Sequence, residues 1–171
     1  MRKRSTEFRP RHGTAATPDE LAEQVQLFIA AIRAVPPEKL RAAHTPDWGP
    51  REILCHLVFW HAQYVSIIRA LLAHKQPLLL TGSFKQHNAD AVRQLSGSRI
   101  EELLASLERS QRELDRFAQL ENIAALCFSF REGSKTRSFP EFVDVIANHF
   151  HSHRLQVQRL MGHRARQVRH A

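Results

Sequence analysis

Five of the eleven histidines in this 171-residue sequence lie on two segments with helical periodicity: His56, His61, His149, His151 and His153. His149 and His153 are four residues apart, so on a helix their side chains share one face, one turn from each other. They occupy a stripe that is otherwise apolar, and we predict that both point into the protein. His151 is two residues from each of them and faces elsewhere.

His56 lies on the apolar stripe of the other segment, between Ile53 and Trp60, whereas His61 lies well round the helix. Two imidazoles one turn apart, with a third from a facing helix, form a set that first-row divalent metals accept. Three protein ligands also leave coordination positions open for water or substrate, as in catalytic sites. The sequence therefore predicts His56, His149 and His153 as metal ligands and catalytic residues, with zinc, nickel or iron as the cofactor.

The alternative is that these histidines are core residues, hydrogen-bonded to the backbone or to one another. Burying several imidazoles demands partners for all their ring nitrogens, which favours the metal or catalytic cluster. Near this cluster, Trp60 and Tyr64 are predicted to wall a pocket for a small-molecule substrate, and Asn88 to offer it a directional hydrogen bond. Plain core packing is the alternative for Trp60 and Tyr64.

Apolar residues recur every three or four positions in four long segments, residues 17–35, 50–74, 98–117 and 138–161, and a shorter helical piece covers 84–95. Capping signals mark three of the starts: Thr17 with Glu20, Ser98 with Glu101, and Ser138 with Glu141. Gly162 is a plausible stop for the last segment. We therefore predict an all-α four-helix bundle, with an extra short helix between helices two and three.

Composition excludes several other classes of protein. No stretch approaches the roughly 18–20 apolar residues that a bilayer span needs, so we expect no membrane partner. The two cysteines, Cys55 and Cys127, belong to no CxxC pair, which excludes a disulfide scaffold and a cysteine-rich zinc site. The basic N-terminus has no apolar segment behind it and does not resemble a secretory signal, so a cytoplasmic location is expected by default.

The formal net charge of +8 is concentrated at the two ends of the chain. Residues 1–16 and 159–171 each carry an excess of four positive charges, and the residues between them balance. We predict a basic disordered arm at 1–16, the helical bundle at 17–162 and a basic tail at 163–171. Because the folded body is neutral, nucleic-acid binding is not expected.

Three segments resemble the DinB-like four-helix bundle proteins, over about residues 18–161. They are the run WGPREILCHL at 48–57 followed by Trp60 and His61, the stretch 84–92 with Asn88 and Ala91, and residues 131–153, which end in HFHSH. In that superfamily, one histidine of the second helix and the HxxxH pair of the last helix bind a divalent metal. The resemblance implies the same role for His56, His149 and His153, the three residues that helical spacing selects.

The middle segment is most similar to the ClbS/DfsB branch, which is associated with self-protection by hydrolysis of a strained electrophilic ring. Two kinds of activity follow from the resemblance. The first is a metal-dependent hydrolase or thiol-dependent transferase that acts on a small electrophilic molecule. The second is a metal-independent protection protein in which the histidines act as general acid or base, since their unperturbed pKa lies near 6.5.

A third reading is a non-catalytic helical homodimer that binds a small ligand. The second helix is apolar on more than one side, and this surface could meet another subunit. Its residues off the main stripe are Val58, Phe59, Val65 and Ile68.

Overall fold

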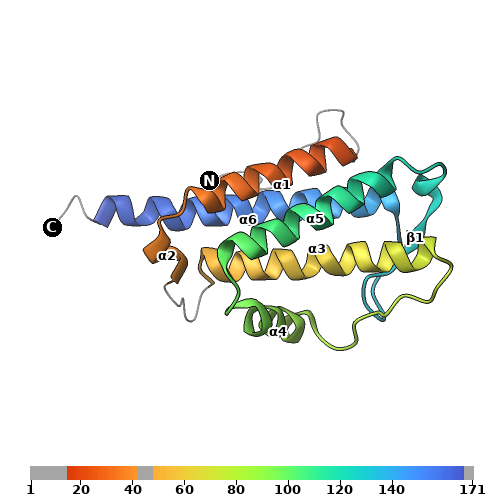
Figure 1. Cartoon of the computed structure of the whole chain (residues 1–171), viewed down its shortest axis with the longest axis horizontal. Coiled ribbons are helices and arrows are strands. Elements are labelled where there is room, and N and C mark those ends of the chain that lie inside the picture. The colour runs from red at the N-terminus through yellow and green to blue at the C-terminus, as the bar shows by residue number, and fades with distance from the viewer. Residues whose placement is uncertain (1–14, 42–47, 168–171) are drawn as a thin grey trace, which may run out of the picture. The chain divides into compact units, whose positions relative to one another are not determined.

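The computed structural model describes residues 15–41 and 48–167, and within them it is mostly helical (Figure 1). The elements in order are α1 (Pro18–Arg33), α2 (Pro37–Arg41), α3 (Pro50–Leu72), α4 (Phe84–Leu95), α5 (Ile100–Ala118), a 3-10 turn (Ile123–Ala125), β1 (Cys127–Phe128), β2 (Arg137–Ser138) and α6 (Phe139–Gln167). The predicted all-α class is confirmed. The four long helices are α1, α3, α5 and α6, and α4 is the predicted extra short helix.

The described residues divide into two compact units, and the first combines those up to residue 53 with those from residue 143 onward. Its helix α1 begins at a complete capping box, in which the Glu20 backbone N–H donates to the Thr17 hydroxyl and the Thr17 N–H donates to the Glu20 carboxylate. Apolar residues of α1 pack on α6, where the Phe28 and Phe150 rings meet edge to face at 5.8 Å. The Ala16 N–H also donates to Asp144 of α6. These contacts fix how α6, which carries His149 and His153, lies against α1.

The second unit comprises residues 54–142 and holds most of α3 together with α4 and α5. On the solvent side, Arg69 of α3 donates two hydrogen bonds to Glu113 of α5. Between the helices lies an apolar core, and aromatic rings fill the end near β1, where Phe128 stacks on Phe142 at 3.9 Å. β1 pairs with β2 in antiparallel register, Cys127 opposite Ser138, which closes the connection from α5 to α6.

Two local predictions are wrong, and one short helix was missed. α5 begins at Ile100 with Arg99 as its cap, one residue later than the Ser98 box predicts. The Ser98 N–H donates to the Leu95 carbonyl, and the Arg99 N–H donates to the Glu102 carboxylate. α6 continues past Gly162 to Gln167. A side chain at Gly162 would meet open space, and an exposed helical glycine costs only about 1 kcal/mol, too little to end a helix. The short helix α2 (Pro37–Arg41) was not predicted.

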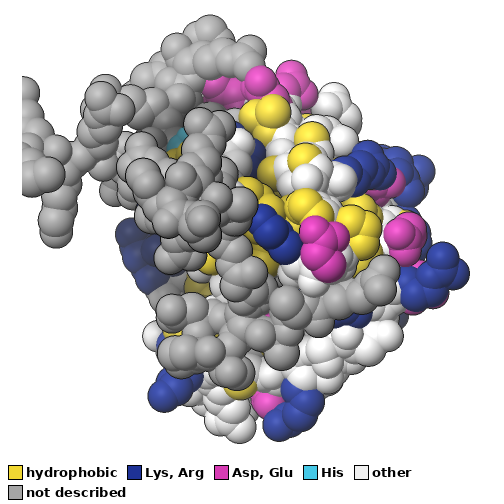
Figure 2. Space-filling view, turned by 90° about the vertical axis from the view of Figure 1, so that its left-hand side faces the viewer, with side chains coloured by type: hydrophobic (Ala, Val, Ile, Leu, Met, Phe, Trp, Pro, Cys, Tyr) yellow, Lys and Arg dark blue, Asp and Glu magenta, His cyan; other side chains and the backbone are white. Residues whose placement is uncertain are grey.

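Some expectations bear on the surface of the molecule. Among the described residues, no helix combines the length and the apolar character that crossing a bilayer requires. On the face in Figure 2, the described basic and acidic side chains are interspersed. The predicted basic arm and the end of the basic tail, residues 1–14 and 168–171, lie outside the described residues.

The apolar surface proposed for a second subunit is largely covered within the chain itself. Val58, Val65 and Ile68 are between 1% and 5% exposed, and Phe59 is half-buried. These side chains therefore belong to the core, and the homodimer loses the observation on which its prediction rested. The homodimer itself stays a prediction.

His61 is a buried titratable group in the second unit. It lies on α3, 1% exposed, and burial lowers its pKa to about 4, against an opposing interaction with the Gln111 side chain. Gln111 in turn donates to Asp115 at 2.7 Å, so a polar chain leads from His61 along α5. The folded protein therefore holds His61 neutral at pH values where the unfolded chain protonates it.

This difference predicts acid destabilisation. The unfolded His61 takes up a proton near pH 6.5 and the folded one only near pH 4, so its stabilising contribution is complete above pH 6.5 and is lost as the pH falls to 4. At about 1.4 kcal/mol per pKa unit, the loss approaches about 3 kcal/mol. Urea unfolding of wild type and His61→Gln between pH 7 and 4 measures it, and the variant is expected to lose less stability over this interval.

The matched control is His74→Asn, because His74 is exposed and its positive φ of 54° suits asparagine. This variant is expected to keep the pH dependence of the wild type. A His61→Gln variant with an unchanged pH dependence would contradict the assignment of this titration to His61.

Candidate metal centre

His149 and His153 lie on the same face of α6, as their spacing predicts. Their ring centroids are 4.8 Å apart, and both side chains are half-buried. The flanking positions on this face, Ile146 and Val157, are 1% and 0% exposed. The helix thus carries two imidazoles in a stripe that is otherwise hydrocarbon.

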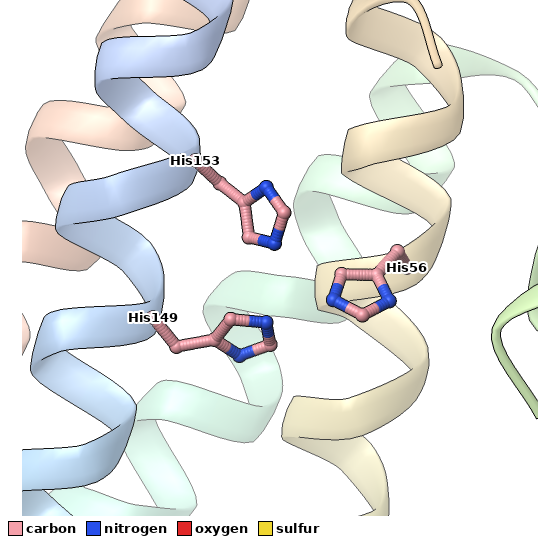
Figure 3. Close-up of side chains that lie close together, drawn as sticks. All are labelled: His56, His149 and His153. Carbon is pink, nitrogen blue, oxygen red and sulfur yellow. The ribbon is translucent and has the colours of Figure 1, made fainter. Parts of the chain in front are cut away.

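His56 completes a group of three histidines that could hold a metal ion. It lies on α3, 5% exposed, and its ring meets Trp60 one turn further along at 6.5 Å, edge to face. One ring nitrogen from each of His56, His149 and His153 lies within 4.8 Å of the others. Figure 3 shows the ring nitrogen farther from the backbone, Nε2, directed in each case toward the other two rings.

This donor set fits a divalent transition metal. Three imidazole nitrogens suit zinc, nickel and iron, and two nitrogens on a tetrahedral ion with bonds of about 2.0–2.1 Å lie roughly 3.4 Å apart. The three ring nitrogens lie within 4.8 Å of one another, and small side-chain rotations bring them to that separation. Burial lowers the pKa of His153, opposed by a hydrogen bond with Gln156, so the ring favours the neutral form that offers a lone pair.

Two neighbours on α6 complete this region. The Nδ1 atom of His153 lies 2.9 Å from the Gln156 Oε1 atom. His151 lies on a different face, as predicted, with its Nδ1 atom 3.3 Å from the Oε1 atom of Gln24 on α1. Gln156 is not among the predicted site residues, although its spacing of three residues from His153 places the two side chains together on a helix.

Of the three predicted substrate contacts, Trp60 and Asn88 contact each other. The Trp60 indole N–H donates to the Asn88 Oδ1 atom at 2.8 Å, which joins α3 to α4. Trp60 is 2% exposed and Tyr64 is 6% exposed, and burial raises the pKa of the Tyr64 hydroxyl. The packing alternative accounts for the present positions of both rings, and substrate binding by the trio stays a prediction.

An aromatic cluster surrounds Trp60 and fixes its orientation. Its ring centroid lies between 5.4 and 6.2 Å from those of five neighbours, which are Phe59, Tyr64, Phe84, His87 and Phe130. Since His56 contacts Trp60 directly, this cluster also supports one of the three candidate ligands. The two histidine-bearing helices are thus held by different means: α3 by aromatic packing and α6 by its contacts with α1.

The model of the DinB superfamily matches residues 20–157, a range that includes all three histidines of the candidate centre. A search of curated proteins found no match.

Solved structures similar to this chain include the following two. One is an uncharacterised protein from Escherichia coli UTI89, with 13% identity, a TM-score of 0.64, and coverage of 82% of this chain and 87% of that one. The other is a protein from Streptococcus pneumoniae, with 15% identity, a TM-score of 0.66, and coverage of 84% and 87%. At these identities the likeness establishes the fold alone.

The Trp60–Asn88 hydrogen bond generates a prediction about stability. Replacing Asn88 by Ala leaves the buried indole N–H without its acceptor, which costs about 1–3 kcal/mol. Asn88→Asp keeps an oxygen acceptor and is expected to lose less. Urea unfolding followed by circular dichroism measures both variants.

Gln94 offers the control, because it is an exposed amide on the same helix. Gln94→Ala is expected to stay within about 0.5 kcal/mol of the wild type, as exposed substitutions usually do. Equal stability of the Asn88→Ala and Gln94→Ala variants would show that the bond does not stabilise the fold.

Proposed function

The chain belongs to the DinB superfamily, and we propose that it is a divalent-metal-dependent enzyme acting on a small electrophilic molecule, as a hydrolase or a thiol-dependent transferase. One observation carries the proposal. His56, His149 and His153 each offer a ring nitrogen within 4.8 Å of the others, inside the segment that matches the superfamily. Zinc, nickel and iron are the metals that this donor set favours.

The proposed roles follow from the position of each side chain. His149 and His153 would hold the ion from one face of α6, and His56 would hold it from α3. A bound divalent ion supplies Lewis acidity, which lowers the pKa of water toward about 7 or stabilises a thiolate. Three protein ligands leave room for a water molecule, a thiol or a substrate atom.

The reaction proposed is displacement at an electrophilic carbon. Water or a thiol forms a new C–O or C–S bond there, while the bond from that carbon to its leaving heteroatom breaks. The leaving atom keeps the electron pair of the broken bond and takes up the proton that the nucleophile gives off. The reaction requires no oxidant or reductant. Trp60, Tyr64 and Asn88 remain the proposed substrate contacts.

The alternative function for the same fold is a ClbS/DfsB-like protection activity that needs no metal. In that case the histidines transfer protons directly, and activity survives a strong chelator. The cytoplasmic location and the non-catalytic homodimer stay predictions. Light scattering that finds a strict monomer at high concentration would remove the homodimer.

Metal content tests the proposal directly. The purified protein, stripped with a chelator and dialysed against zinc or nickel, is expected to retain one ion per chain by elemental analysis. His149→Ala should weaken binding by more than the roughly 10–100-fold that loss of an outer hydrogen-bond partner typically costs, because it removes a ligand. Isothermal titration calorimetry of the stripped protein measures this change.

His151→Ala is the matched control, since His151 lies on the same helix between the two candidate ligands and faces Gln24. It is expected to bind zinc as the wild type does. Absence of stoichiometric metal in the wild type, or equal affinity in the His149→Ala and His151→Ala variants, would refute the proposed centre.

A further inference from the structure

One ring nitrogen of His153 is already engaged within α6 itself. Its Nδ1 atom lies 2.9 Å from the Gln156 Oε1 atom, a carbonyl oxygen that can only accept a hydrogen bond. In this arrangement a neutral His153 ring carries its proton on Nδ1 and its lone pair on Nε2. The contact thus selects one of the two tautomers of the ring.

The selected tautomer is the one that a metal centre requires. Figure 3 shows the His153 Nε2 atom directed toward the His56 and His149 rings, and a ligand nitrogen must be unprotonated. If the Gln156 amide were turned over, its NH2 group would donate to Nδ1, and the ring proton would move to Nε2 and block the site. The orientation with Oε1 toward His153 is thus the one compatible with an ion.

The position of Gln156 also suits it to orient the ring. It lies three residues after His153 on the same helix, and its side chain is half-buried. The next residue, Val157, is 0% exposed and anchors this turn of α6 in the core. Because the amide is neutral, it fixes the ring without adding a negative charge beside the centre.

We propose that Gln156 is a positioning residue of the metal centre, which holds His153 in the Nδ1-protonated tautomer and so keeps Nε2 unprotonated. This inference rests on the proposed function. It goes beyond it by assigning an outer partner to one ligand and a tautomer to its ring.

The test compares three variants of the full chain: Gln156→Ala, Gln156→Glu and Gln158→Ala. Gln158 is exposed on the same helix, so its alanine variant controls for the loss of a helical glutamine. Gln156→Glu keeps an oxygen acceptor for the Nδ1 proton. The first readout is the His153 tautomer in the metal-free protein, from ring ¹⁵N shifts assigned by the signal lost in His153→Ala. The second is zinc affinity by competition with a chromophoric chelator.

We expect His153 to be protonated on Nδ1 in the wild type, Gln156→Glu and Gln158→Ala proteins, and to shift toward the Nε2-protonated form in Gln156→Ala. We also expect Gln156→Ala to bind zinc roughly 10–100-fold more weakly, with Gln156→Glu close to the wild type. A Gln156→Ala protein with an unchanged tautomer, or with the zinc affinity of Gln158→Ala, overturns the inference. Failure of the wild type to take up zinc overturns the proposed function instead, and the tautomer readout distinguishes the two failures because it needs no metal.

Discussion

A buried imidazole must find a partner for each of its ring nitrogens, and this requirement shapes the polar interior of the protein. A neutral ring has one donor and one acceptor nitrogen, and leaving either unpaired away from water costs free energy. His61 lies beside Gln111, which itself donates to Asp115, and burial holds the ring neutral. On α6 the Nδ1 atom of His153 pairs with the Gln156 side chain, and the Nε2 atom of His153 is directed toward the His56 and His149 rings.

The fold was predictable to the extent that its signals are local. The Thr17–Glu20 box and the bounds of α4 follow from neighbouring residues, and both are found. The start of α5 was missed because two overlapping boxes compete there, and the choice depends on how α4 ends. The end of α6 was missed because glycine is a weak stop where no other residue opposes the helix. The pairing of β1 with β2 is a contact between strands of two residues, too short for a periodic signal.

The candidate site was predictable where chemistry and helical periodicity coincide. His149 and His153 stood out because a polar pair at i, i+4 interrupts an apolar stripe, and His56 because it interrupts another. Trp60 and Asn88 were each predicted to contact substrate, but they contact each other across 28 residues of sequence. No local pattern encodes such a pair. The same spacing argument applies to Gln156, three residues after His153. It was not predicted because glutamine is common on helices and its presence alone does not indicate a site.

The neutrality of this donor set narrows the chemistry that it supports. Three imidazoles and a neutral amide behind one of them add no negative charge, so the full charge of a bound divalent ion would remain available to groups in the open positions. Thiolate or carboxylate ligands would neutralise much of that charge. A neutral set therefore favours reactions in which an anionic nucleophile must be stabilised near neutral pH, as in hydrolysis and thiol transfer. The amide is part of this balance, since a carboxylate at position 156 would orient His153 equally well but would reduce the net positive charge of the centre.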